Sequence, residues 1–210
     1  MIRKLFRTEE AETGRVEAFS DGVLAIVITL LVLDIKVPHD IKSDAALWQA
    51  IVELGPTIGA WAISFLFVLV FWVAHHTLFA QLRKVDRGLL WLNGLFLFGI
   101  SFSPFPTALA GAYPGATPAV FLLSLVMFFT SASFVLMRWY ATVIGNLTRP
   151  EYPRVYFVQA TLRSLIAPLL YAAALGLSFP VPWGAVYLQI LVPILFVFPE
   201  RAPATNTAKP

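Results

Sequence analysis

The sequence predicts an all-α membrane protein with six transmembrane helices. Of its 210 residues, 59% are hydrophobic and only 13% are charged, and the mean hydropathy is +0.78. About a quarter of the residues in a typical soluble domain are charged. A single core in a chain of this length cannot bury so much apolar surface, so lipid has to cover much of it.

A helix needs about 20 mostly apolar residues to cross the hydrocarbon core of a bilayer. Six stretches of the sequence meet this requirement, the last of them only with its flanking Pro and Trp residues at the membrane interface. These stretches are Val16–Ile35, Pro56–Phe79, Leu89–Gly111, Ala119–Ile144, Tyr156–Phe179 and Trp183–Phe198. An even number of spans predicts that both ends of the chain lie on the same side of the membrane.

Some of these helices have sequence features that interrupt or extend them. Ala45–Leu54 is amphipathic and precedes a Gly55–Pro56 pair, so helical turns are expected before the second span. Pro104 and Pro106 lie inside the third segment and predict a kink, which helices in a bilayer tolerate. Arg163 lies inside the fifth segment, and its long side chain is expected to reach toward the interface.

The positions of Lys and Arg predict the orientation. Basic residues gather in the N-terminal arm, in the connection between the second and third spans, and around the connection between the fourth and fifth. The connections at 112–118 and 180–182 carry no charge, and only 36–44 mixes basic with acidic residues. Because basic loops stay in the cytoplasm, both termini are predicted to be cytoplasmic.

Composition also predicts the character of the two terminal segments and argues against several functions. Residues 1–14 form a polar cytoplasmic arm without the apolar core of a signal peptide, 15–199 the transmembrane domain, and 200–210 a disordered cytoplasmic tail. The chain has no Cys, no phosphate-binding loop and no catalytic triad, so neither an enzyme nor a cofactor is expected. No dense basic face predicts a nucleic-acid partner.

The first helix contains an acidic residue at membrane depth. Its apolar run, 23–33, has only eleven residues, so Ser20 and Asp21 must lie at or inside the membrane boundary. Arg15 lies on a different face of this helix, and Glu17 would repel Asp21, so Asp21 needs a partner on another helix. The alternative is that Ser20 or Asp21 caps a shorter helix, with Arg15 at the interface.

One face of the first helix carries a stripe about 80° wide at 100° per residue. It consists of Phe19, Ile26, Thr29 and Leu33, with Leu30 beside them. Such a stripe either packs against another helix or lines a pore, and Thr29 could simply bond back to its own helix. Periodicity does not separate these interpretations.

The stretch Arg15-x-x-x-Phe19-Ser20-Asp21, followed by residues 22–33, resembles the signature of the transmembrane protein 175 family of potassium channels. The likeness is to its bacterial single-repeat members. It implies a homotetramer in the bacterial inner membrane, with six helices per subunit and the first helix lining a central pore for potassium ions. The partners it implies are potassium ions, the lipid bilayer and further copies of the chain.

The resemblance also implies roles for single residues. Arg15, Phe19, Ser20 and Asp21 match the family motif that holds the pore helix by hydrogen bonds. Ile26 matches the constriction, Thr29 a polar layer and Leu33 a second apolar ring. Narrow apolar rings gate conduction by losing their water. Since Thr-Val-Gly-Tyr-Gly is absent, only modest selectivity is expected.

Residues of the second and third spans complete this predicted network. Trp72, His75 and Asn93 match the family and lie at the depth of Asp21, where each hydrogen bond between helices contributes about 1 kcal/mol. Whether His76 takes part stays open. A resident metal is not expected, because His75 and His76 point in different directions on a helix. The competing function is a proton- or ion-coupled secondary transporter that uses Asp21 and His75.

Overall fold

The computed structural model describes residues 13–197, and all its regular elements are helices. The prediction of an all-α protein is therefore confirmed for this part of the chain. Residues 1–12 of the predicted arm and the whole predicted tail, 200–210, lie outside the described residues. The elements are α2 (Thr13–Leu30), η1 (Leu31–Asp34), α3 (Asp44–Glu53), α4 (Gly55–Ala80), α5 (Arg87–Ser101), α6 (Pro104–Ala112), α7 (Thr117–Trp139), η2 (Tyr140–Ile144), α8 (Arg154–Ser164), α9 (Ile166–Leu177) and α10 (Pro182–Val197).

Five helical stretches have the length and hydropathy needed to cross a membrane. They are Thr13–Asp34, Gly55–Ala80, Arg87–Ala112, Thr117–Ile144 and Arg154–Leu177. They coincide with the first five predicted spans. The sixth predicted span is also a helix, α10, but its 16 described residues are fewer than the about 20 needed to span hydrocarbon. The count of six spans stays a prediction.

Local sequence explains where several helices begin. The side chain of Asp86 accepts a hydrogen bond from the Leu89 amide at 2.9 Å and caps α5, and Ser43 caps α3 in the same way. A proline stands in the first turn of α4, α6 and α7, where its missing N–H costs no helical hydrogen bond.

Prolines also interrupt two predicted spans. The third divides at 102–103, so that α5 ends at Ser101 and α6 begins at Pro104, as the proline pair predicted. The fifth, expected to be continuous, divides at Leu165 between α8 and α9. Pro168 in the first turn of α9 cannot donate to the carbonyl of Ser164, which explains this break.

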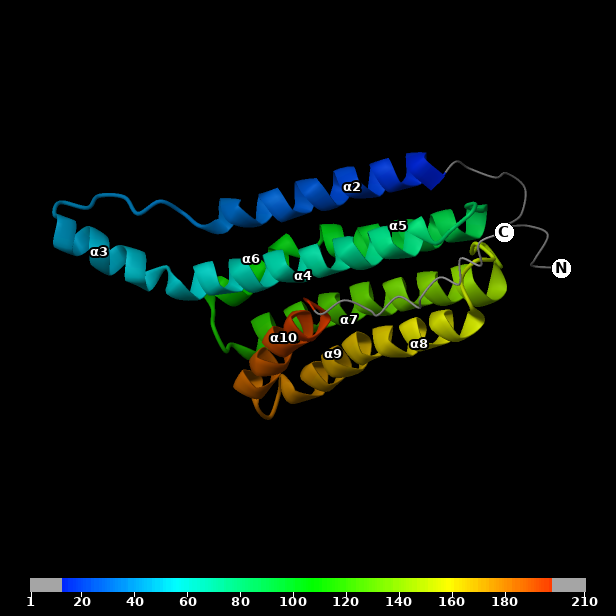
Figure 1. Ribbon diagram of the computed structural model, residues 1–210. Helices are drawn as coiled ribbons and strands as arrows, with labels where there is room; N and C mark the ends of the chain where they lie inside the picture. Colours follow the sequence, from blue (N-terminus) through cyan, green and yellow to red (C-terminus); the bar gives the residue numbers. More distant parts are fainter. Residues whose placement is uncertain (1–12, 198–210) are drawn as a thin grey trace.

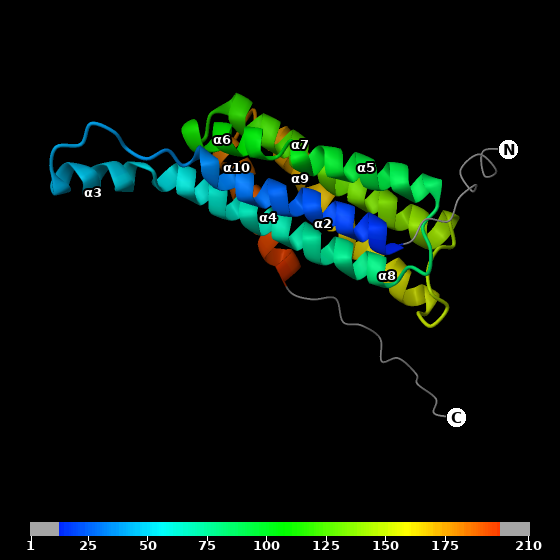
Figure 2. The same ribbon diagram turned by 90° about the horizontal axis from the view of Figure 1, so that it is seen from above.

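The helices run nearly side by side as one bundle, with α7 between α5 and α9 (Figures 1 and 2). Aromatic rings fill its centre, where Phe71 contacts Phe67, Phe96 and Phe134, and Tyr171 contacts Phe67. These rings thus join α4, α5, α7 and α9, and the buried residues of α2 pack onto the same core from its edge.

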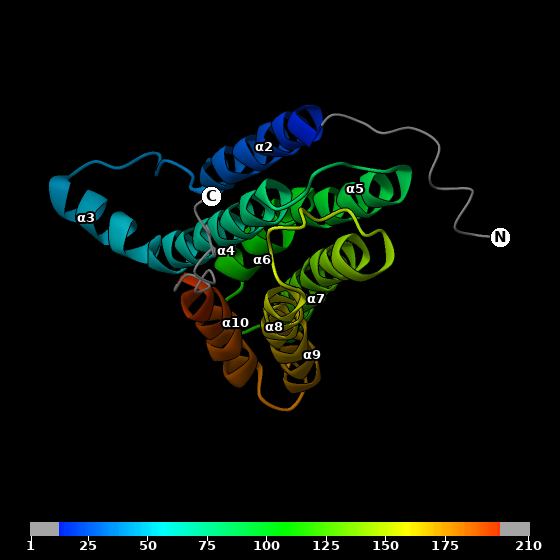
Figure 3. The same cartoon turned by 45° about the vertical axis from the view of Figure 1, so that its right-hand side comes forward.

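Helix α2 lies at the edge of the bundle and packs on α4 and α5 (Figure 3). Helix α3 projects beyond the end of the bundle and none of its residues is buried, so it is a separate helix before the second span, where the sequence predicted helical turns (Figure 1). The position of α2 leaves one of its faces without contacts in the single chain, and that face is central to the candidate site.

Candidate functional site

A chain of hydrogen bonds joins three helices through buried side chains. His75 of α4 donates from Nε2 to Oδ1 of Asn93 of α5 over 3.0 Å. The Nδ2 of Asn93 donates to Oγ of Ser20 of α2 over 2.9 Å, and Ser20 donates to the carbonyl of Val16 at 2.9 Å. The direction of each bond follows from the amide, whose oxygen can only accept and whose nitrogen can only donate. Every member of this chain is at most 3% exposed, apart from Val16, of which only the carbonyl takes part.

The ring of His75 is held by aromatic neighbours as well as by Asn93. It stacks on Phe79, with centroids 4.2 Å apart and an interplanar angle of 19°, and faces Phe96 at 5.9 Å. These two rings restrict the orientation of the imidazole, whose Nε2 lies 3.0 Å from Oδ1 of Asn93. The imidazole therefore acts as a structural connector between α4 and α5.

A second, separate contact joins α2 to α4. Trp72 donates from Nε1 to Oδ1 of Asp21 over 3.0 Å. The ring of His76 stacks on Trp72 at 6.0 Å with an angle of 19°, so His76 supports this pair by ring contact. Asp21 thus has its partner on another helix. The N-cap alternative is excluded, because α2 begins at Thr13, well before Ser20 and Asp21.

The structure brings together five of the seven residues predicted for the network and leaves two apart. Ser20, Asp21, Trp72, His75 and Asn93 form the two contacts just described. Arg15 and Phe19 lie on the exposed side of α2, with Phe19 65% exposed. Their side chains are exposed and are not packed against α4 and α5, so the single chain shows no part for them in these two contacts.

The predicted stripe of α2 occupies its exposed face. Ile26 is 60% and Leu30 44% exposed, and Leu33, in the η1 turn that continues α2, is 61% exposed. Thr29 is exposed too, and its hydroxyl donates back to the carbonyls of Ala25 and Ile26 at 3.1 and 2.9 Å. Its hydroxyl oxygen still has acceptor capacity toward the space outside the chain.

The opposite face of α2 is buried against the bundle. It consists of Val16, Ser20, Leu24 and Val27, and Leu31 of η1 continues it. The helix is therefore held by one face through apolar packing and polar contacts. The stripe faces whatever surrounds the single chain, whether lipid or another copy.

Sequence reasoning missed other polar contacts between helices. Ser64 of α4 and Thr107 of α6 share a hydrogen bond of 2.7 Å. Gln189 of α10 donates to the Ser124 hydroxyl at 2.6 Å and to the Val120 carbonyl at 3.2 Å. The available signal was a lone polar side chain inside each apolar run, but the run does not tell which helix supplies the partner.

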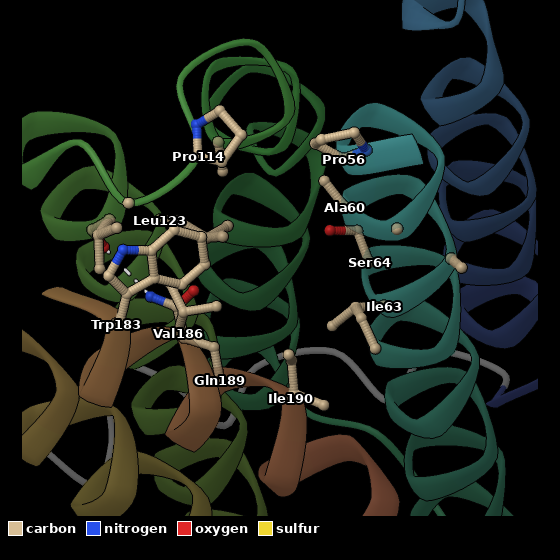
Figure 4. Close-up of a pocket in the computed structure, with 15 residues that line it drawn as sticks. Pro56, Ala60, Ile63, Ser64, Pro114, Leu123, Trp183, Val186, Gln189 and Ile190 are labelled. Carbon is tan, nitrogen blue, oxygen red and sulfur yellow. Dashed lines mark hydrogen bonds between the residues drawn. The ribbon is translucent and has the colours of Figure 1, made fainter. Parts of the chain in front are cut away.

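A cavity of about 540 Å³ lies between α4, α6, α7 and α10, at the N-terminal end of α4 beside Pro56 (Figure 4). Its lining residues include no ionisable side chain, and no residue of α2 is among them. The polar groups at its base, Ser64 and Gln189, already bond to protein partners. The cavity has few polar groups that could replace the water around an ion, so it is a poor candidate for an ion path through one chain.

No group of three or more His, Asp or Glu side chains is arranged to hold a metal ion within residues 13–197.

Comparison with known proteins finds relatives along most of the chain. Residues 15–104, which contain every predicted site residue, match the family model described as endosomal/lysosomal potassium channel TMEM175. A protein named as a potassium channel from Streptomyces collinus is 39% identical over 174 residues, which cover 80% of this chain and 83% of the relative. One from Chamaesiphon minutus is 36% identical over 198 residues, covering 92% and 98%.

A more distant relative and a solved structure extend the comparison. Human TMEM175, named as an endosomal/lysosomal proton channel, is 35% identical over 182 residues, which cover 81% of this chain but only 36% of the human protein. The crystal structure of a TMEM175 homologue from Chamaesiphon minutus, titled as a lysosomal potassium-selective channel homologue, superposes with a TM-score of 0.78 at 36% identity. The match covers 88% of this chain and 96% of that one. By sequence along most of its length, and by fold, this chain belongs to the TMEM175 family, whose members are multi-pass membrane proteins.

Proposed function

We propose that this protein is a potassium-preferring cation channel, a homotetramer in which α2 of each subunit lines a central pore. The observation that carries the proposal is the exposed stripe of α2, which faces away from the bundle while the opposite face is bonded to α4 and α5. The names of the two bacterial relatives support the choice of ion.

Four copies of the stripe around one axis would form stacked rings. Rings of Ile26 and Leu33 would constrict the pore, with Leu30 beside them, and an apolar neck of this kind conducts only when it widens enough to stay wet. Thr29 would form a polar layer between these rings. Its hydroxyl oxygen could replace part of the hydration shell of a potassium ion, which accounts for modest rather than strong selectivity.

The buried polar contacts would keep the pore helix in place. The Asp21–Trp72 pair and the Asn93–Ser20 bond both join the N-terminal half of α2 to its neighbours. Arg15 and Phe19, exposed in the single chain, would then be available to an adjacent subunit. In this proposal residues 15–199 form the channel domain in a bacterial inner membrane, with both termini cytoplasmic.

The hydrogen bonds of Asp21 and His75 give less support to the competing hypothesis of a transporter. A relay would need Asp21 and His75 to exchange a proton, but Asp21 bonds to Trp72 while His75 bonds to Asn93. The two residues belong to separate contacts.

Electrical recording from the purified full-length protein in lipid bilayers tests the proposal. Under a potassium gradient, a passive channel gives a current that reverses near the potassium equilibrium potential and shifts toward zero as sodium replaces potassium. A reversal potential that follows a second, coupled ion instead would support the transporter. Cross-linking in the membrane tests the tetramer, because a protein that stays monomeric cannot form this pore.

A further inference from the structure

Two connections at the basic end of the bundle are fastened to each other by their backbones. The amide of Arg83, after α4, donates to the carbonyl of Leu147 at 2.9 Å. In return, the amide of Arg149, before α8, donates to the carbonyl of Gln81 at 2.9 Å. Leu82 and Thr148 form an antiparallel bridge between these two bonds. The backbones of the two connections are therefore held at fixed relative positions.

The turn after η2 adds to this rigidity. Asn146 has φ of 51°, a left-handed conformation that Asn tolerates better than most residues. The turn folds Leu147 back so that its amide donates to the carbonyl of Ala141 at 3.0 Å and its side chain is buried. Leu147 thus fixes the backbone of the turn that lies next to the basic residues.

Between the two connections lies a polar hollow of about 310 Å³. Three arginines line it, Arg83, Arg149 and Arg154, together with the neutral donors Thr142 and Thr148 and the side chain of Asn146. Its lining residues include no carboxylate. The nearby Asp86 is already engaged, since it accepts hydrogen bonds from the Leu89 amide and from the Tyr140 hydroxyl.

The arginines keep most of their hydrogen-bonding capacity. Arg149 donates from Nε to the carbonyl of Leu82 at 3.2 Å, which orients its guanidinium group. Within residues 13–197, none of the three arginines forms an ion pair. Three neighbouring arginines with no carboxylate among the lining residues give the hollow a positive potential, which attracts an anion from outside the chain.

We propose that this hollow binds a phosphate group, supplied in the membrane by the headgroup of an anionic phospholipid. Arginine is the side chain best suited to phosphate oxygens, because its planar fork donates two parallel hydrogen bonds. The hollow lies where α8 begins and where the stretch Thr117–Ile144 ends, which is the level of lipid headgroups if these helices span the bilayer. Basic pockets between membrane helices bind anionic headgroups in this way.

The aromatic side chains beside the hollow fit an interfacial position. Tyr152 and Phe157 both line it, and their ring centroids are 6.1 Å apart. Aromatic rings concentrate at the level where headgroups meet hydrocarbon. A phospholipid could thus place its phosphate among the arginines and its glycerol backbone against these rings. This site does not depend on α2, so the proposal is independent of the channel function.

Lipid titration of the purified full-length protein by native mass spectrometry tests the proposal. Phosphatidylglycerol should bind wild type at least about tenfold more tightly than phosphatidylcholine, because the choline cation of phosphatidylcholine would lie close to the three arginines and be repelled by them. Arg83→Gln and Arg154→Gln should each abolish most of this preference. Arg87→Gln is the matched control, because Arg87 is an exposed arginine of the same end that does not line the hollow, and it should retain the preference.

Two further measurements decide whether the bound phosphate comes from a lipid and whether the effects of the variants are specific to the hollow. Inorganic phosphate should not compete with phosphatidylglycerol at equal concentration, and full competition would assign the hollow to free phosphate and overturn the lipid assignment. Circular dichroism of each variant checks that it is folded. If Arg87→Gln lost as much preference as Arg154→Gln, or if wild type did not distinguish the two lipids, the proposal would be wrong.

Discussion

Asn93 on α5 donates a hydrogen bond of 2.9 Å to the hydroxyl of Ser20 on α2, and the same amide accepts one from His75 on α4. One side chain therefore joins three helices at a single level of the bundle. Because all three groups are buried, losing one leaves the others without a partner in a region that water does not reach.

We expect Ser20→Ala to destabilise the protein more than Ser131→Ala does. Both serines are buried and donate back to their own helix, but only Ser20 also accepts a bond from another helix. The extra loss should be about 0.5–1.5 kcal/mol, the usual range for a hydrogen bond between membrane helices. Denaturant unfolding in detergent, followed by circular dichroism, measures both variants. Equal losses would mean that the Asn93 bond adds no stability.

Ile26→Asn should raise the conductance of the reconstituted protein. A polar side chain at the proposed constriction keeps the neck wet at a radius at which isoleucine would exclude water. Ile166→Asn is a matched control, because Ile166 is also an exposed isoleucine but lies on α9, away from α2. Single-channel recording of both variants gives the comparison. An unchanged conductance for Ile26→Asn would place the constriction elsewhere.

Thr29→Ala should reduce the preference for potassium over sodium, since it removes the hydroxyl oxygen of the proposed polar layer. Thr29→Ser keeps that oxygen and should retain most of the preference. The reversal potential under bi-ionic conditions, with potassium on one side and sodium on the other, reports the ratio. If serine and alanine gave the same ratio, the hydroxyl would play no part in selectivity.

Gly99→Ala and Gly94→Ala should have opposite effects on stability, although both lie on α5. A methyl group at Gly99 would come within 2.7 Å of the Thr130 hydroxyl and 2.8 Å of the Phe129 ring, so overpacking should cost about 1–3 kcal/mol. At Gly94 a methyl group meets nothing within 4 Å, and alanine should stabilise the helix by up to about 1 kcal/mol.

Thermal unfolding of these two variants in the same detergent provides the check. A loss at Gly94 as large as that at Gly99 would show that α5 has a further neighbour in the assembled protein.

The sequence alone was sufficient to predict the class of protein and the positions of most of its helices. Apolar runs of about 20 residues mark membrane spans because hydrocarbon cannot bond to an exposed backbone, so each run must be helical. The membrane depth of Asp21 predicted a partner on another helix, since a carboxylate there needs one. The pair Pro104 and Pro106 predicted that the third span is interrupted by a kink, because proline cannot continue the hydrogen-bond ladder.

Boundaries inside long apolar stretches were harder to predict. The fifth predicted span reads as continuous, yet it divides at Leu165, and the effect of Pro168 became visible only from the helix ends. The sixth stretch was recognised, but hydropathy does not decide whether a helix of 16 described residues spans the bilayer.

Within the candidate site, residue types could be predicted from sequence, but pairings could not. Family resemblance pointed to Trp72, His75 and Asn93 as partners of the motif on the first helix. Only the packed bundle assigned Trp72 to Asp21 and Asn93 to Ser20, and left Arg15 and Phe19 outside. The physical reason is that periodicity tells which residues share a helical face, whereas the rotation of each helix about its axis depends on how side chains from different helices fill the space between them.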